Sequence, residues 1–212
     1  MTTALLNAQG LACTRGNQRL FSDINLQLGT GQWLYLQGEN GAGKTSLLRI
    51  LAGLTLPTEG NVLWQDSPIG KQRSQYHQDL LYIGHHAGLK EDLTLTENLQ
   101  AQLAIDGIQA SAAAIRDALT QMGLGKRQHL PARVLSAGQK RRGLLARALL
   151  RPAKLWILDE PFNALDVKAI ADVHNLLKAH LANGGLLVLT SHQTPDLGQD
   201  AAGFILNLSG AR

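Results

Sequence analysis

Short, continuous apolar runs recur along the chain and predict strands that are buried on both faces. Such runs are typical of parallel sheets in α/β proteins, because helices cover both sides of the sheet. A half-exposed strand would instead alternate apolar and polar residues. The runs occupy residues 32–37, 80–83, 155–158, 186–190 and 204–208. The pattern therefore predicts an α/β core.

Alternating apolar and polar positions predict a second kind of strand near the N-terminus. Residues 4–13 and 19–28 alternate in this way and are joined through a Gly-Asn pair that favours a turn. Residues 61–65 predict a further strand. The stretch 67–78 is polar and without periodicity, so we expect a loop or irregular structure there.

Helical spacing dominates the middle of the chain. Residues 94–150 are rich in Ala, Leu and Gln, and apolar residues such as Leu99 and Leu103 recur at intervals of three or four. This segment predicts a helical subdomain inserted into the α/β core. Residues 167–182 predict another helix, which the Asn-Gly-Gly sequence at 183–185 ends.

A glycine-rich stretch follows the first buried strand and precedes a predicted helix over residues 44–53. It fits the phosphate-binding pattern G-x-x-x-x-G-K-S/T. Its glycines let the backbone aim N–H groups at phosphate oxygens, and the helix N-terminus adds a positive partial charge. We expect Lys44 to reach the β- and γ-phosphates and Thr45 to contact Mg²⁺. The expected nucleotide-binding residues here are Gly38, Glu39, Asn40, Gly41, Ala42, Gly43, Lys44, Thr45 and Ser46.

Composition narrows the classes of protein. The 212 residues, 44% of them hydrophobic, are enough for one compact domain, which we expect to span residues 1–212. No apolar run approaches the length of a membrane span, and the first residues lack the pattern of a secretory signal. A single cysteine, Cys13, excludes an internal disulfide. The net charge of +4 is diffuse and aromatic residues are few, so we expect no nucleic-acid partner.

An acidic pair ends the buried strand at 155–158. Asp159 and Glu160 would lie at the carboxyl edge of a parallel sheet, where ligands of such sheets bind. Asp159 can then hold Mg²⁺, and Glu160 can polarise an attacking water. An apolar run followed by two acidic residues is common and is weak evidence by itself. Together with the phosphate-binding loop it becomes strong evidence for a nucleotide site.

The segment Leu135-Ser136-Ala137-Gly138-Gln139 resembles the L-S-G-G-Q signature of ABC transporter ATPases, with alanine in place of the first glycine. Taken alone, it is also an ordinary Ser-capped helix start with basic residues behind it. Two further motifs follow in the family's order. Ala164-Leu165-Asp166 matches the D-loop, and His192 matches the switch histidine that senses the γ-phosphate.

The resemblance implies a fold and a mechanism. We expect a P-loop NTPase of ABC type, in which a mixed sheet core carries an antiparallel β subdomain and the inserted helical subdomain. ATP and Mg²⁺ are the implied ligands. Two copies are expected to form a homodimer in the ATP-bound state. Ser136 and Gly138 of one copy would then close on the γ-phosphate bound by the other.

A narrower resemblance is to the ATP-binding subunits of bacterial haem exporters that act in cytochrome c maturation. It is carried by the short chain, the signature with its following Arg141-Arg142, and the run Trp156 to Asp166. Thr190-Ser191-His192-Gln193 and Gly84-His85 also match. The implied partners are integral membrane subunits of the haem exporter, at the cytoplasmic face of the inner membrane.

Two positions depart from the usual pattern. Arg15 occupies the place where most ABC ATPases carry an aromatic residue that stacks on adenine, and a guanidinium plane can also stack on a purine. His85, followed by His86, occupies the place of a glutamine that contacts Mg²⁺ and the attacking water. We expect His85 to take over part of that role.

Three alternatives stay open at this level. The chain could energise a different exporter, for lipids or drugs. It could be a soluble ABC protein acting on DNA or ribosomes, although these usually carry two cassettes or long insertions. It could also bind nucleotide without hydrolysis, against which the presence of both Glu160 and His192 argues.

Overall fold

A computed structural model describes residues 4–85, 88–198 and 201–208 of the chain. Its core is a five-stranded sheet, in which all neighbouring strands run parallel. The strand order is β6 (Leu80–Ile83), β7 (Leu155–Leu158), β8 (Leu186–Thr190), β3 (Trp33–Gly38) and β9 (Gly203–Leu208). The five apolar runs of the sequence are these five strands, so the predicted α/β core is confirmed.

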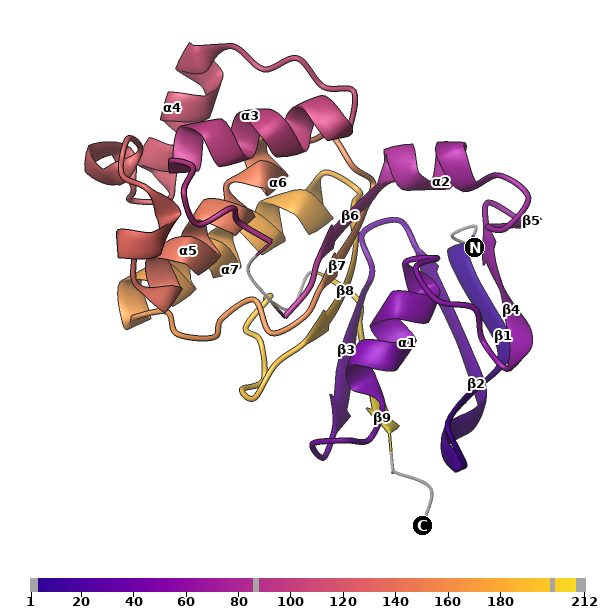
Figure 1. Cartoon of the computed structure of the whole chain (residues 1–212). Coiled ribbons are helices and arrows are strands. Elements are labelled where there is room, and N and C mark those ends of the chain that lie inside the picture. Colours follow the sequence, from indigo (N-terminus) through magenta and orange to yellow (C-terminus); the bar gives the residue numbers. More distant parts are fainter. Residues whose placement is uncertain (1–3, 86–87, 199–200, 209–212) are drawn as a thin grey trace.

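The second sheet is antiparallel and packs beside helix α1 (Lys44–Leu51), as Figure 1 shows. Its order is β2 (Gln18–Gly29), β1 (Ala4–Arg15), β4 (Glu59–Trp64) and β5 (Ser67–Pro68). The predicted antiparallel subdomain is therefore confirmed. The expectation of a mixed core sheet is wrong in this detail. The described strands of the core sheet are all parallel, and the antiparallel pairs belong to the second sheet.

Side chains on opposite faces of the central strands pack into two different hydrophobic cores. Leu155 and Ile157 of β7 face the antiparallel sheet and α1, whereas Trp156 and Leu158 face the helices on the other side. Strand β8 alternates in the same way. This double burial explains why β7 and residues 186–189 of β8 are all apolar.

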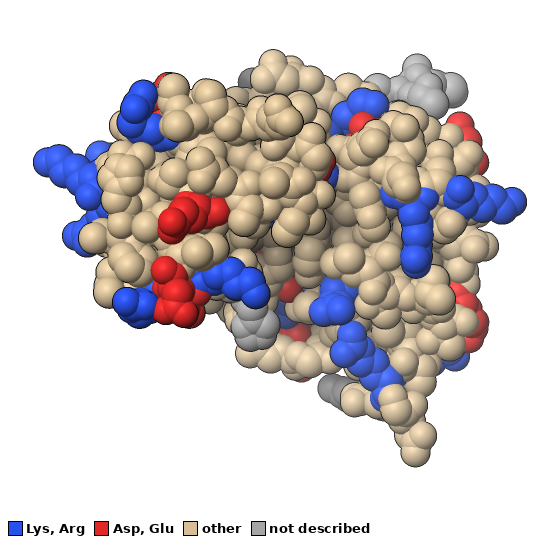
Figure 2. Space-filling view, turned by 45° about the horizontal axis from the view of Figure 1, so that its top comes forward, with Lys and Arg blue, Asp and Glu red and all other residues tan. Residues whose placement is uncertain are grey.

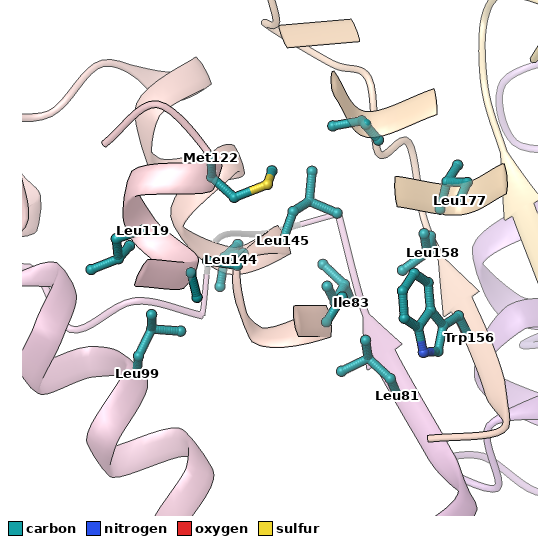
Figure 3. Close-up of a cluster of buried hydrophobic side chains, with 14 of the residues drawn as sticks. Leu81, Ile83, Leu99, Leu119, Met122, Leu144, Leu145, Trp156, Leu158 and Leu177 are labelled. Carbon is teal, nitrogen blue, oxygen red and sulfur yellow. The ribbon is translucent and has the colours of Figure 1, made fainter. Parts of the chain in front are cut away.

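The helical segment contains α3 (Leu95–Ile105), α4 (Ala112–Gln121), α5 (Ala137–Leu145) and α6 (Arg147–Leu150), with short 3-10 turns η1 (Gly125–Arg127) and η2 (Ala132–Val134). Its leucines belong to the same buried cluster as the outer face of the core sheet (Figure 3). Leu99 and Leu119 come from the helices, and Ile83 and Trp156 come from the strands. Helix α7 (Val167–Ala182) covers the same face and ends at Gly184, which adopts a φ of 83°.

The expectation of loop at residues 67–78 is wrong. This stretch forms the short strand β5 and helix α2 (Arg73–Asp79). Tyr76 is fully buried, and its hydroxyl donates a hydrogen bond to the carbonyl of Leu51. Asp79 accepts a 3.0 Å hydrogen bond from the indole of Trp64. Contacts with distant segments thus stabilise α2. Its own sequence, in which Tyr76 is the one large apolar residue, does not predict a helix.

None of the described helices is both long and apolar enough to cross a membrane.

Candidate nucleotide site

The glycine-rich loop connects β3 to α1, as the sequence predicts. Gly43 precedes α1 with a φ of 96°, a left-handed conformation that glycine adopts without strain. Gly38, at the end of β3, has no room for a side chain, because a Cβ atom would lie 2.6 Å from the carbonyl oxygen of Leu208. Within the described part of the chain, no side chain caps α1. Its first N–H groups are thus available to an anion.

Lys44 bridges this loop with its ammonium group. Its Nζ donates to the carbonyl oxygens of Gly38 at 2.6 Å and Glu39 at 3.0 Å. Both acceptors are solvent-accessible backbone groups, so the lysine can exchange them for phosphate oxygens without leaving a buried group unpaired.

Asp159 lies at the carboxyl end of β7 and is 3% exposed. Its Oδ2 accepts a 2.8 Å hydrogen bond from Thr45, and its Oδ1 accepts a 2.7 Å hydrogen bond from Thr190. The carboxylate is thus turned towards the first residues of α1. A hydroxyl and a carboxylate side by side are the oxygen ligands that Mg²⁺ prefers when phosphates and water supply the rest.

The donor set fits a metal site that is shared with a nucleotide. In the part of the chain that the structure describes, no group of three or more His, Cys, Asp or Glu residues could hold a metal ion by itself. Thr45 and Asp159 would therefore hold Mg²⁺ together with the nucleotide.

Glu160 follows Asp159 with a φ of 54°, which is unusual for a residue with a side chain. Its backbone N–H donates 2.9 Å to the hydroxyl of Thr190. Its carboxylate is largely buried and lies 3.8 Å from Nε2 of His192. Strained backbone of this kind is retained where the surrounding structure fixes it, commonly at functional sites.

Two supporting residues were missed by the sequence analysis. Thr190 holds both members of the acidic pair, and the only signal was its place at the end of a neighbouring strand. Arg141 stands in a basic stretch behind the signature, where the sequence gives it no role in the nucleotide site. It is instead buried, and its guanidinium donates to the carbonyl of Gly84 at 2.8 Å and to that of Asp159. Burial lowers the pKa of Arg141, and nearby Asp159 and Glu160 oppose that shift.

The phosphate-binding loop and the acidic pair line one open hollow of about 500 Å³. It is lined by residues from both sheets, the glycine-rich loop, and the ends of β6, β7 and β8. The predicted site residues that line it are Arg15, Asn40, Gly41, Gly43, Lys44, Thr45, Ser46, His85, Asp159, Glu160 and His192. His86 lies outside the described residues.

Three residues of the loop do not line the hollow. Gly38 and Glu39 contribute the carbonyls that hold Lys44, and Ala42 is buried.

The signature residues Ser136 and Gly138 lie apart from this hollow. Ser136 begins α5 as its N-cap: its hydroxyl accepts from the N–H of Gln139 at 3.2 Å, and the Gln139 side chain accepts from the N–H of Ser136 at 3.0 Å. Gly138 packs against the D-loop, since a Cβ atom there would lie 2.3 Å from the carbonyl oxygen of Ala164. The phosphate-binding loop and the start of the signature helix are therefore two separate places on one chain.

Comparison with known proteins agrees with this arrangement. A family model described as ABC transporter matches residues 21–163. The chain belongs to the ABC transporter family, as one of its ATP-binding proteins.

Individual relatives indicate a narrower group within this family. The chain is similar to the cytochrome c biogenesis ATP-binding export protein CcmA of Methylococcus capsulatus, with 52% identity over 99% of this chain and 100% of the relative. CcmA of Pseudomonas aeruginosa is 48% identical over 89% of this chain and 93% of the relative.

Solved structures show the same fold. A post-hydrolysis dimer of the ATP-binding cassette MJ0796, bound to ADP and Pi, matches with a TM-score of 0.84. It is 22% identical and covers 96% of this chain and 94% of the other. A structure described as the ATP-binding subunit of an ABC transporter matches with a TM-score of 0.81 and 26% identity, over 96% of this chain and 88% of the other.

Proposed function

We propose that this ABC ATPase energises the membrane export complex of cytochrome c biogenesis, where it acts as the ATP-hydrolysing subunit of a haem exporter. The observation that carries ATP hydrolysis is the acidic pair held by Thr190 opposite Lys44 and Thr45. The similarity to CcmA proteins over most of the chain supports a role in cytochrome c biogenesis.

Binding of ATP follows from the loop geometry. The N–H groups at the start of α1 face the phosphates, and Lys44 turns from the carbonyls of Gly38 and Glu39 to the β- and γ-phosphates. Arg15, at the edge of the hollow, stacks on the adenine. Thr45 and Asp159 would hold Mg²⁺, which would neutralise charge on the phosphates.

Hydrolysis needs a base beside the γ-phosphate. Glu160 is positioned for this role by the Thr190 hydrogen bond, and its carboxylate orients a water for attack. His192, whose Nε2 lies 3.8 Å from the Glu160 carboxylate, contacts the γ-phosphate. His85 comes after β6 and reports the state of this site to the membrane subunits.

A second copy of the chain completes the site. Ser136 and Gly138 lie away from the hollow of their own chain, so they serve the nucleotide of a partner in a homodimer. The dimer of a similar fold bound to ADP and Pi supports this arrangement. Closure of the dimer on ATP and its opening after hydrolysis then drive integral membrane subunits at the cytoplasmic face of the inner membrane.

The test is purification of the chain from native membranes, followed by identification of the membrane proteins that accompany it. We expect integral membrane subunits and ATPase activity that requires Mg²⁺. Cells that lack the chain should fail to form covalent cytochrome c. Normal cytochrome c in those cells would remove the haem exporter role and leave the ATPase assignment intact. Association with ribosomes or DNA in place of membrane proteins would contradict export itself.

A further inference from the structure

A second cavity, far from the phosphate-binding loop, opens between α2, the end of α1 and the strands β4 and β5. It measures about 300 Å³, at the lower end of the range for small-ligand sites. We call it the α2 pocket. Helix α1 carries Lys44 and Thr45 at its start and Ile50, a wall of the α2 pocket, at its other end. The two sites are therefore distinct.

The walls of the α2 pocket are apolar and preformed. Ile50, Val62 and Tyr76 are buried, and the half-buried Ile69 lies among the apolar lining residues. The Tyr76 hydroxyl donates to the carbonyl of Leu51, so the ring presents an apolar face whose polar atom is already paired. Its edge-on contact with Trp64, with ring centroids 5.7 Å apart, fixes its orientation. Preformed apolar walls with satisfied polar groups favour an apolar ligand.

The rim of the α2 pocket is basic. Lys71, Arg73 and His77 line it, and no Asp or Glu is among its described lining residues. Lys71 and Arg73 are exposed and form no ion pair with any residue that the structure describes. Figure 2 shows basic side chains projecting from this part of the molecule, over α2 and the antiparallel sheet. Lys71 and Arg73 can therefore pair with a negatively charged group of a ligand.

Exposed leucines extend the apolar surface outwards. Leu56, which lines the α2 pocket, is 78% exposed, and Leu54 beside it is 49% exposed. An isolated exposed leucine needs no explanation, but Leu56 lines an apolar pocket that has a cationic rim, so the surface there is amphipathic. The ligand that fits combines a hydrocarbon chain with an acidic headgroup.

We propose that the α2 pocket binds an anionic amphiphile, whose acyl chain enters between Ile50, Ile69 and Tyr76 while its acidic headgroup pairs with Lys71 and Arg73. Two sources share this chemistry: an anionic membrane phospholipid and a free fatty acid. A basic surface next to an inserted apolar group is the arrangement that retains peripheral proteins at anionic membranes. The proposal does not depend on which exporter the ATPase serves.

The experiment uses the purified full chain and two probes. The first is flotation with vesicles of equal parts phosphatidylglycerol and phosphatidylcholine, against vesicles of phosphatidylcholine alone. The second is calorimetric titration with oleate below its micelle concentration. We expect binding to the anionic vesicles, weakened by salt, or to oleate, or to both. Vesicle binding alone identifies a membrane lipid, and oleate binding alone identifies a free acid.

Variants separate the pocket from general charge attraction. Lys71→Ala with Arg73→Ala should weaken binding by about 25-fold, since each basic side chain near an anionic surface strengthens binding roughly fivefold. Leu56→Asn and Ile69→Asn should weaken it as well, and Leu56 is exposed enough for its replacement to leave the fold intact. The matched controls are Lys126→Ala with Arg127→Ala, an exposed basic pair elsewhere, and Val134→Asn, an exposed apolar residue.

Three outcomes would overturn the proposal. In the first, the chain binds neither probe. In the second, the control variants lose as much affinity as the pocket variants do, so the attraction is general. In the third, the charge variants weaken binding while Leu56→Asn and Ile69→Asn, shown to be folded by circular dichroism, do not, so no chain enters the pocket.

Discussion

The hydroxyl of Thr190 donates a 2.7 Å hydrogen bond to Oδ1 of Asp159, and both groups are buried. The same hydroxyl oxygen accepts the backbone N–H of Glu160 at 2.9 Å. One side chain at the end of β8 therefore fixes the direction of the metal-binding carboxylate and the start of the strained turn that presents the base.

This contact gives a prediction for Thr190→Val, which keeps the shape of the side chain and removes its hydroxyl. A buried carboxylate oxygen and an N–H lose their partner, so the free energy of unfolding should fall by about 1–3 kcal/mol. Hydrolysis should fall about 10- to 100-fold, as is usual when the group that orients a metal ligand is lost. Denaturant unfolding and steady-state ATPase assays measure the two effects. Thr190→Ser, which keeps the hydroxyl, should retain most of both; an equal loss in Thr190→Ser would contradict the role of the hydrogen bond.

Glu160→Gln tests the base. The amide keeps the size of the carboxylate but cannot take a proton, so hydrolysis should fall by about 100-fold or more. Nucleotide binding should persist, and an ATP-bound dimer should accumulate in size-exclusion chromatography. Lys44→Ala is the contrasting variant and should weaken nucleotide binding itself. Turnover near the normal rate in the Glu160→Gln protein would show that another group activates the water.

Complementation between two variants tests the composite site. Lys44→Ala damages the phosphate loop, and Ser136→Arg damages the signature helix, so neither homodimer should hydrolyse ATP. In a mixed dimer, one site combines an intact loop with an intact signature. Mixing should therefore restore activity to about one working site per heterodimer. If heterodimers form, as mass spectrometry can show, and stay inactive, the sites do not lie between two copies.

Arg15 should contribute to affinity with little effect on rate. It offers the purine a planar cation without base-specific contacts, so ATP and GTP should bind within about tenfold of each other. Arg15→Ala should weaken ATP binding by roughly 0.5–2 kcal/mol, the range for one cation–π contact. The rate at saturating ATP should stay nearly unchanged, because the base is remote from the bond that breaks. Titration and initial-rate measurements separate these effects, and a large loss of rate at saturation would place Arg15 elsewhere.

His85 is the residue we expect to couple hydrolysis to the membrane subunits. It lines the hollow and follows β6 at the junction with the helical segment. His85→Ala should reduce ATPase activity only moderately, because Lys44, Asp159 and Glu160 are intact. Covalent cytochrome c formed in cells should fall much further. Normal cytochrome c formation in His85→Ala cells would show that this loop does not carry the signal.

Sequence alone determined the elements whose signal is local. The apolar runs predicted all five core strands. Burial on both faces explains the apolar sequence of the central strands, whereas β9 lies at the sheet edge with Phe204 and Ile205 exposed. The glycine spacing of the phosphate loop and the serine that begins α5 were also readable, since backbone conformation and helix capping depend on adjacent residues. Val167–Ala182 was predicted to the residue for the same reason.

Tertiary structure decided what depends on residues far apart in the chain. Helix α2 forms although its sequence is polar, because Tyr76 and Asp79 meet Leu51 and Trp64. Arg141 belongs to a basic stretch of sequence, yet the fold buries it against the carbonyls of Gly84 and Asp159. Hydrogen bonds between segments depend on where the sheet places its strand ends. No local sequence pattern predicts those positions, because side-chain burial and hydrogen bonding between distant segments arise only when the sheets and helices pack together.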